Sequence, residues 1–481
     1  MDYLKLNLYE VKEKLDTGEI TSYELTKRCF EQIEKTKDLN TLISTCEEFA
    51  FQIATEIDRR RLAGEKLGKL AGIPIVIKDN INLKGFKTTC ASKFLENFVS
   101  PYTATCAQKL LDEGAVIIGK ANMDEFAMGS SNENSAFGAV RNPVNPNYVP
   151  GGSSGGSAAT VASFECFGSL GTDTGGSIRE PASFCGTVGL KPTYGRVSRY
   201  GVVAFASSLD QVGTLTRSVR DSAIMLNCIS GEDKFDMTSS KQQVPDFEKC
   251  ITGNIQGVKI GVAREFFSDK LSGEVRKALD NALDFYKANG AELVDVSLPS
   301  LDTALSVYYI ISSAEATSNL ARFDGVKYGV QAKNFNDIVD LYFKSRTQGF
   351  GKEVKRRIML GNYVLSSGYF DAFYRKAKGV QKVIEKEFET AFSKCDVLIS
   401  PTTANPAFKI GEKSGDHLAM YLTDIYTVPV NIAGLPAMSL PCGKSKDGLP
   451  IGMQLIAPKW REDTLFNVGE FFESHKEAKN V

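Results

Sequence analysis

The stretch GGSSGGSAATVASFECFGSLGTDTGGSIREP, residues 151–181, differs in composition from the rest of this 481-residue chain. Two of its Gly-Gly-Ser units end in Ser153 and Ser177, which lie 24 residues apart. Glycines permit backbone angles that other residues resist, and they let successive N–H groups point into one cavity. A serine at the end of such a loop combines a nucleophile with donors for an oxyanion. The stretch therefore predicts an acyl-transfer site, with a purely structural Gly/Ser loop as the alternative.

Two other glycine-rich motifs do not fit this stretch. A phosphate-binding P-loop needs G-x-x-x-x-G-K-[ST], and no Lys-Ser or Lys-Thr follows these glycines. A dinucleotide site needs G-x-G-x-x-G between a strand and a helix, and that spacing is missing. The pattern thus favours a loop that presents a nucleophilic serine over a nucleotide-binding loop.

Working outward, short apolar runs alternate with amphipathic segments along the chain. Residues 73–77 form a continuous apolar run that ends at Lys78, which is typical of a buried strand. We expect further strands near residues 115–118, 259–263, 292–296, 396–401, 436–440 and 452–456. We expect helices within residues 1–65, at 103–113, 158–164 and 274–288, over much of 301–394, and at the C-terminus. Within the first region, Thr21 and Glu24 resemble a capping box. This rhythm predicts an α/β sheet wrapped by helices.

Charge and composition limit the function classes. Lys plus Arg is 57 and Asp plus Glu is 58, which argues against broad, nonspecific nucleic-acid binding by this chain alone. We expect the basic runs at 59–61 and 352–357 to be solvated helix faces. Ten cysteines form no C-x-x-C motif and no zinc spacing, so we expect reduced thiols. No signal peptide or membrane-spanning run is found, so we expect a cytoplasmic protein that has no membrane partner.

Histidine is nearly absent, which changes the choice of catalytic base. The two histidines, His417 and His475, lie in a polar loop and a charged tail, which weakens a Ser-His-Asp scheme and a His-based metal site. Serine needs a base, and lysine serves when burial or cationic neighbours lower its pKa. Lys78 is the candidate. The alternative is a buried salt bridge from Lys78 to Asp79 or Asp173, and the residues alone leave both interpretations open.

These segments together resemble the amidase signature hydrolases. The resemblance rests on residues 72–80, 150–157, 171–179 and 189–193, and extends from near the N-terminus to the last strand. It implies a large mixed twisted sheet covered on both faces by helices, in one domain over residues 1–481, with the catalytic region at 72–200. It also implies Ser177 as nucleophile, Ser153 as a bridging serine often held through a cis peptide, and neutral Lys78 as base. Ser154 is the rival to Ser153. The implied oxyanion hole consists of Thr174, Gly175, Gly176 and Ser177.

Within the family, the chain is similar to the glutamine-hydrolysing subunits of tRNA-dependent amidotransferases. Residues 122–135, 354–361 and 421–427 carry this likeness. It implies that Arg357 and Asp424 hold the α-carboxylate and α-amino group of glutamine. The mainly helical region 301–395 would contribute to the substrate pocket. The implied substrate contacts are Met128, Gly129, Ser130, Asp173, Tyr308, Arg357 and Asp424. Without this likeness, Arg357 would be interpreted as a surface charge and Asp424 as a helix N-cap, in preference to substrate-binding roles.

The resemblance also implies a reaction and partners. Glutamine would be hydrolysed through a Ser-cisSer-Lys acyl-enzyme, and the ammonia would convert Glu-tRNA(Gln), or Asp-tRNA(Asn), in a heterotrimer. This chain would need no cofactor and no metal. ATP and Mg would bind a B-type kinase/transamidase subunit, beside a small C-type subunit and charged tRNA. The alternatives are a stand-alone amidase on aryl or aliphatic amides, a noncatalytic assembly protein, and a separable helical insertion at about 301–395.

Overall fold

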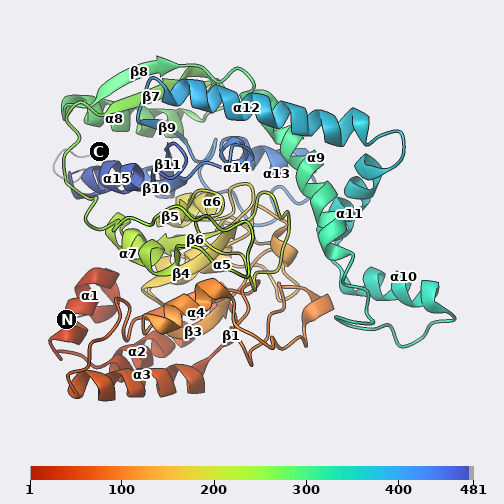
Figure 1. Cartoon of the computed structure of the whole chain (residues 1–481), viewed down its shortest axis with the longest axis horizontal. Helices are drawn as coiled ribbons and strands as arrows, with labels where there is room; N and C mark the ends of the chain where they lie inside the picture. The colour runs from red at the N-terminus through yellow and green to blue at the C-terminus, as the bar shows by residue number, and fades with distance from the viewer. Residues whose placement is uncertain (1, 476–481) are drawn as a thin grey trace.

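A single mixed sheet organises the molecule. The computed structural model describes residues 2–475, and within them eleven strands form one sheet in the order β1-β3-β2-β4-β6-β5-β10-β11-β9-β7-β8 (Figure 1). The strands are β1 (Leu42–Thr45), β2 (Pro74–Lys78), β3 (Val116–Ala121), β4 (Gly168–Asp173), β5 (Val188–Lys191), β6 (Gln211–Thr216), β7 (Lys259–Ala263), β8 (Glu292–Val296), β9 (Val397–Pro401), β10 (Ala437–Lys444) and β11 (Pro450–Ile456). Both ends of the order contain parallel pairs, whereas the centre, from β4 to β9, is antiparallel.

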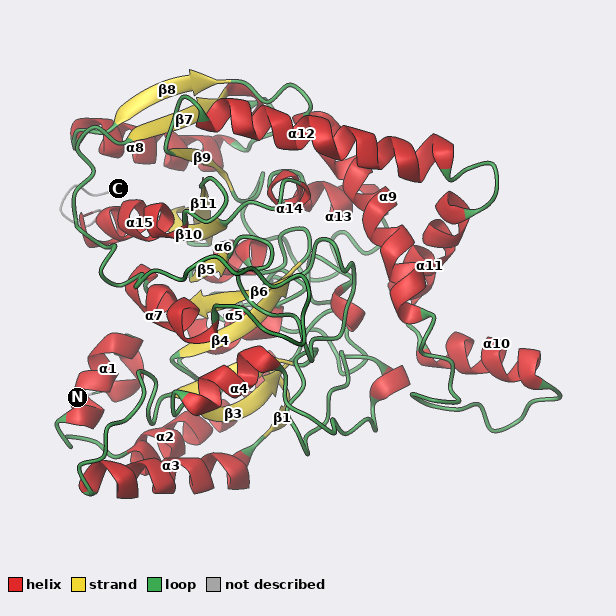
Figure 2. Cartoon of the chain, in the orientation of Figure 1, coloured by secondary structure: helices red, strands yellow, loops and turns green. Residues whose placement is uncertain are grey.

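Helices flank this sheet along its length (Figure 2). They are α1 (Leu8–Asp16), α2 (Ser22–Lys35), α3 (Glu47–Leu62), α4 (Thr105–Asp112), α5 (Gly155–Ala162), α6 (Arg179–Cys185), α7 (Val219–Ile229), α8 (Gly273–Ala288), α9 (Leu301–Leu320), α10 (Ile338–Gly349), α11 (Lys352–Leu365), α12 (Lys376–Phe392), α13 (His417–Tyr421), α14 (Val428–Ile432) and α15 (Glu462–His475). None of the helices within residues 2–475 has the length and apolar character to cross a bilayer.

Both faces of the sheet are covered, as strand β4 illustrates. Gly168 faces the sulfur of Met225 on α7, where a Cβ would come within 2.3 Å. Gly171, three residues on and therefore on the opposite face, lies against Ser154 and Ile178, which precede α5 and α6. The α/β class and the mixed sheet expected from the sequence are therefore confirmed.

Most expected elements are present, and the differences have local reasons. Residues 1–65 are not purely helical, because β1 separates α2 from α3 and pairs antiparallel with β3. Strands β4, β5 and β6 were not predicted, because their glycines and threonines lack the apolar pattern of a strand. Thr21 caps α2 by accepting from the N–H of Glu24, as expected. The ten cysteines are unpaired, and all but Cys250 are buried.

The register of β2 and β4 positions the site. The two strands are parallel neighbours, with Ile77 opposite Leu170. Their carboxyl ends therefore meet at one edge, where Lys78 ends β2 and Asp173 ends β4. The segment from α9 to α12 forms a mainly helical layer at one side of the sheet (Figure 1), and α11 packs extensively on α9.

Candidate active site

Lys78 lies completely buried among hydroxyl and carbonyl groups. Its Nζ lies 2.8 Å from Ser153 Oγ, 2.8 Å from Ser154 Oγ, and 2.9 Å and 3.3 Å from the hydroxyl and carbonyl oxygens of Thr172. None of the ion pairs formed within residues 2–475 involves Lys78. Asp79 and Asp173, the two alternative salt-bridge partners considered for Lys78, form ion pairs with other residues.

Those two pairings overturn the salt-bridge interpretation of Lys78. Asp79 lies 3.3 Å from the Nζ of Lys120, and Asp173 forms an ion pair with Arg179, with all four side chains buried. Burial therefore acts on Lys78 without a contacting counter-ion. It lowers the pKa of Lys78 to about 7, because the charged form is poorly solvated, although the more distant carboxylates of Asp124 and Asp173 oppose the shift.

Ser153 and Ser177 approach each other through neighbouring backbone. The Gly152–Ser153 peptide bond is cis, as the family resemblance implied. Ser153 is fully buried, whereas Ser177 is 8% exposed. The N–H of Ser154 donates to the carbonyl of Ser177 at 3.1 Å. Within the described residues, the Ser177 hydroxyl has no hydrogen-bond partner, so Lys78 and Ser153 are linked directly but Ser177 is joined only through its main chain.

The loop before Ser177 presents only part of the expected set of N–H donors. The N–H of Gly176 donates to Asp173 Oδ1 at 2.8 Å, so the expectation that Gly176 supplies an oxyanion donor is wrong for this conformation. Within residues 2–475, no acceptor binds the N–H of Thr174, Gly175 or Ser177. These three N–H groups remain free for a ligand.

Asp173 supports this loop. Its carboxylate accepts from the N–H groups of Gly176 and Ile178, the side chain of Asn431 and two nitrogens of Arg179. Burial alone would raise its pKa, but the Arg179 guanidinium holds the pKa of Asp173 at about 2. Both oxygens of Asp173 already bind the protein, and its contact with a substrate stays a prediction.

Two residues fix the middle of the loop. Thr427 Oγ1 donates to the carbonyl of Gly175 at 2.6 Å. The ring of Tyr308, on α9, lies so close to Gly175 that a Cβ there would come within 2.6 Å of it. Tyr308, a predicted substrate contact, thus reaches the nucleophile loop. Thr427 lies in the segment 421–427 that carries the likeness, but the sequence assigned it no contact.

Arg357 is buried, in contrast to the surface charge that its basic run suggested. Its Nε donates to Glu353 at 2.7 Å, and its guanidinium lies 4.4 Å from the ring centre of Tyr309 and 4.9 Å from that of Tyr421. Tyr421 also donates to Glu353 at 2.9 Å. The Nη1 atom is buried, and it has no partner within residues 2–475. A cation held this way has one donor edge left to bind an anion.

Asp424 lies at the hydroxyl end of Tyr309. Its Oδ2 accepts from Ser130 at 2.8 Å and from the Tyr309 hydroxyl at 3.4 Å. Burial raises the pKa of Asp424 to about 6, although hydrogen bonds from Ser130 and neighbouring Glu180 and the charge of Arg357 oppose the rise. No backbone N–H within the described part of the chain is capped by this side chain, so the N-cap interpretation is wrong.

The remaining predicted contacts lie around Asp124, which the sequence did not single out. Met128 is fully buried. Gly129 packs against Asp124, since a Cβ added to Gly129 would lie 2.4 Å from the carboxyl carbon of Asp124. Asp124 accepts from the N–H groups of Asn132 and Asn134, and its own N–H donates to the carbonyl of Ser153 at 3.3 Å. Asp124 therefore joins the 129–134 loop to the cis peptide.

The histidines lie away from these groups. His417 Nε2 is 2.8 Å from Arg356, and His475 lies in the last turn of α15. Within residues 2–475, no cluster of three or more His, Cys, Asp or Glu side chains is arranged to hold a metal ion.

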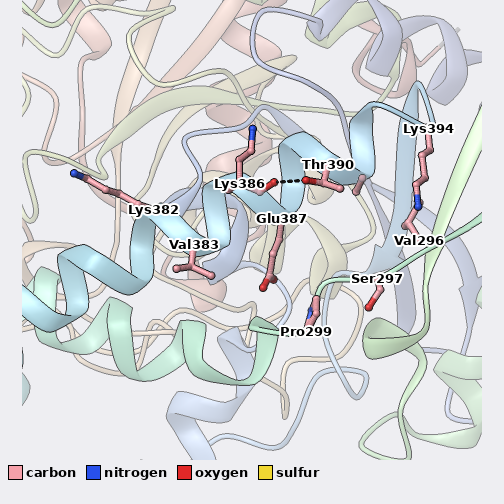
Figure 3. A pocket seen from close by; sticks show the side chains of 10 residues that line it. Val296, Ser297, Pro299, Lys382, Val383, Lys386, Glu387, Thr390 and Lys394 are labelled. Atoms are coloured by element: carbon pink, nitrogen blue, oxygen red, sulfur yellow. Dashed lines mark hydrogen bonds between the residues drawn. The ribbon is translucent and has the colours of Figure 1, made fainter.

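A separate surface cavity of about 530 Å³ lies between α12 and the segment after β8 (Figure 3). Lys382, Lys386 and Glu387 project around it, and Thr390 donates to the carbonyl of Lys386. None of the predicted site residues lines this cavity.

Comparison with known proteins identifies relatives over nearly the whole chain. The family model described as Amidase matches residues 24–466. The A-type subunit of glutamyl-tRNA(Gln) amidotransferase from Clostridium botulinum (strain Langeland) is 54% identical over 474 residues, covering 98% of both chains. The protein of the same name from Caldanaerobacter subterraneus subsp. tengcongensis is also 54% identical, over 98% of this chain and 97% of its own.

Solved structures agree with this assignment. The crystal structure of the corresponding glutamyl-tRNA(Gln) amidotransferase subunit from Thermotoga maritima superposes with a TM-score of 0.82 at 40% identity, covering 98% of this chain and 95% of that one. Native peptide amidase from Stenotrophomonas maltophilia gives a TM-score of 0.83 at 28% identity, covering 99% and 98%. The family match, the identity and the shared fold lead to one conclusion: this chain belongs to the amidase family.

Proposed function

We propose that this chain is the A-type subunit of a glutamyl-tRNA(Gln) amidotransferase and hydrolyses glutamine to supply ammonia for the transamidation of Glu-tRNA(Gln). Full-length identity of 54% to proteins of that name supports the assignment. The observation that carries it is the position of Tyr309, whose ring centre lies 4.4 Å from the guanidinium of buried Arg357 and whose hydroxyl lies 3.4 Å from buried Asp424. One cation and one anion beside the same tyrosine match the zwitterionic end of an amino acid.

The helix that carries Tyr309 also reaches the nucleophile loop. Tyr308, the neighbour of Tyr309 on α9, contacts Gly175. Arg357 Nη1 would bind the α-carboxylate and Asp424 the α-ammonium group. The side-chain amide of glutamine would then extend toward Ser177. A neutral amide has no use for this pair of charges.

The complete burial of Lys78, which lowers its pKa to about 7, supports its assignment as a neutral base. A neutral amine has two N–H donors and one lone pair. The Ser154 hydroxyl donates to the carbonyl of Thr172 at 3.1 Å, so it accepts from Lys78. Thr172 offers two acceptors for the second N–H, its hydroxyl oxygen at 2.9 Å and its carbonyl oxygen at 3.3 Å. The lone pair is left for the hydroxyl of Ser153, which favours Ser153 over Ser154 as the proton carrier.

The proposed reaction follows from these roles. Ser177 Oγ, after rotating toward Ser153, attacks the side-chain amide carbon of glutamine. Its proton passes to Ser153, whose own proton passes to Lys78. The N–H groups of Thr174, Gly175 and Ser177 stabilise the oxyanion. The C–N bond breaks, the proton returns to the leaving nitrogen as ammonia, and a γ-glutamyl ester of Ser177 remains. Water attacks this ester by the reverse proton path and releases glutamate.

Partners complete the proposal. Ammonia would pass to a B-type subunit that binds ATP and Mg, beside a small C-type subunit in a heterotrimer working in the cytoplasm, with charged tRNA held by the complex. Asp-tRNA(Asn) is a further acceptor. We propose that this chain, as one amidase domain, needs no cofactor of its own.

The test compares glutamine with a neutral primary amide that lacks the α-groups. Asp424→Asn should raise KM for glutamine at least about tenfold, the scale of one charged hydrogen bond, and leave turnover of the neutral amide within about twofold. Co-purification with two other proteins, and faster glutamine hydrolysis when charged tRNA and ATP are added, would support the complex. Equal loss on both substrates would favour a stand-alone amidase. No labelling of Ser177 by a serine-directed phosphonate would favour a noncatalytic protein.

A further inference from the structure

Glu180 is a buried carboxyl that the reaction above does not use. It lies in the first turn of α6, three residues after Ser177, and is 0% exposed. Its N–H donates to the carbonyl of Gly176 in the nucleophile loop at 2.9 Å. Within the described residues, no donor reaches either carboxyl oxygen of Glu180. A buried carboxylate that accepts no hydrogen bond is strongly disfavoured. We therefore expect this carboxyl group to be protonated.

The carboxyl that faces Glu180 is that of Asp424. The two side chains are in hydrogen-bonding contact if one of them carries a proton. Two ionised carboxylates would only repel each other, whereas one proton between them makes a donor of one and an acceptor of the other. The pair then has a single negative charge.

The surroundings decide which carboxyl carries the proton. Asp424 also accepts from Ser130 and Tyr309 and feels the charge of Arg357, all of which favour its ionised form. Glu180 has no such donors. Burial and the charge of Asp424 hold the pKa of Glu180 well above its ordinary value.

The other charged groups near Glu180 do not change this assignment. Lys413 is the cation near Glu180, but its Nζ lies 4.1 Å from the ring centre of Phe408, and in the part of the chain that the structure describes it forms no ion pair with Glu180. Asp124 adds negative charge, which further favours a protonated Glu180. The proton therefore stays on Glu180, and the charge on Asp424.

We propose that Glu180 is a positioning residue of the glutamine site: in its protonated form it donates to Asp424 and orients that carboxylate toward the α-ammonium group. This rests on the function proposed above. One proton leaves one negative charge, which matches the single positive charge of the ammonium group. Without the donor, Asp424 could rotate, and its negative charge would be less well stabilised.

Two substitutions separate the donor from the ionisable group. Glu180→Gln keeps a donor beside Asp424 but cannot ionise, and Glu180→Met keeps the length but removes the donor. With the full chain in its active complex, we expect Glu180→Met to raise KM for glutamine about tenfold, with kcat changed less than about threefold. Glu180→Gln should restore KM to within about threefold of the parent. Turnover of a neutral primary amide should be unchanged in both.

An infrared difference spectrum tests the proton itself, without substrate. Near pH 8, the parent minus Glu180→Gln spectrum should contain the C=O band of a protonated carboxylic acid. Glu165, a buried carboxyl bound to Thr36, Thr41 and Ser163, provides a kinetic control: Glu165→Gln should leave KM for glutamine unchanged.

The outcomes distinguish this inference from the proposed function. No carboxylic-acid band from Glu180, or an unchanged glutamine KM in Glu180→Met, would overturn the positioning role while leaving glutamine hydrolysis intact. If the parent complex does not hydrolyse glutamine, the proposed function fails, and the infrared band would still report on the acid–carboxylate pair. If Glu180→Met does not fold, the infrared result decides.

Discussion

The guanidinium of Arg179 binds the carboxylate of Asp173 through two hydrogen bonds of 3.0 Å, and both side chains are completely buried. The two residues lie on either side of the loop 174–177 that presents Ser177. Asn431, Gln454 and the carbonyl of Thr427 bind the other edges of Arg179. The Asp173–Arg179 ion pair therefore joins the two ends of the nucleophile loop. Through Arg179, this ion pair is also hydrogen-bonded to α14 and β11.

Asp173→Asn should destabilise the protein, because it leaves the Arg179 charge buried without its counter-ion. Breaking a buried pair in this way costs about 3–5 kcal/mol of the free energy of unfolding. Urea denaturation followed by circular dichroism would measure the loss. The matched control is Asp280→Asn, which removes an exposed pair with Arg276 and should cost about 0.5 kcal/mol or less. Equal losses in the two variants would contradict the supporting role of Asp173.

The neutral state of Lys78 predicts a pH dependence of kcat. Burial lowers the pKa of Lys78 to about 7, so below that pH the amine is protonated and has no lone pair for Ser153. We expect kcat for glutamine to rise as pH increases through about 7 and then level off. Lys78→Arg, which stays protonated, should lose activity about 10³-fold or more at every pH.

A second measurement checks the same pKa through stability. An unfolded lysine keeps its proton up to its ordinary pKa of about 10.4, while folded Lys78 releases it near 7. The unfolded state thus binds more protons between these values, and the contribution of Lys78 to the unfolding free energy rises with pH in that window. Lys78→Met should flatten this part of the stability curve. A parent and a Lys78→Met variant with the same slope would contradict the lowered pKa.

The family resemblance of residues 72–80 and 150–157, and not their composition alone, predicted which groups meet. The end of a buried strand at Lys78 and the glycine loop at Ser153 made both residues candidates, and the resemblance implied their contact, which measures 2.8 Å. The free Ser177 hydroxyl could not, because its rotation depends on packing. Nor could the loss of the Gly176 N–H to Asp173, since the sequence does not show which acceptor a loop N–H will choose.

The long-range partners of residues in the segment 421–427 could not be predicted from the sequence. Thr427 reaches Gly175 across 252 positions, and Tyr421 reaches Glu353 across 68. Such pairs depend on the sheet order, in which neighbours along the chain are often not neighbours in space. Strand β4 was missed for a related reason: its Gly168 and Gly171 are required by close packing on either face and carry no hydrophobic pattern.

Gly175→Ala should disturb the nucleophile loop selectively. The added Cβ would lie 2.6 Å from the ring of Tyr308, which is too close for the ring to stay where it is. We expect kcat for glutamine to fall at least about tenfold, since the N–H of Gly175 would move from its position. Steady-state kinetics would measure this fall. Gly379→Ala, on α12 with open space around it, is the control and should preserve kcat and slightly stabilise the helix. Full activity in Gly175→Ala would argue that this N–H is not an oxyanion donor.

Adjacent arginines on α11 provide a test of the carboxylate site. Arg357 is 4% exposed, stacks on Tyr309 and Tyr421, and keeps a buried Nη1 free within residues 2–475, whereas Arg356 is 36% exposed beside His417. A lysine at 357 retains the charge but loses the planar fork and the stacking. We expect Arg357→Lys to raise KM for glutamine about 10- to 100-fold, and Arg356→Lys to change it less than about twofold. If the two variants behaved alike, the charge of α11 as a whole, and not the fork of Arg357, would be what glutamine requires.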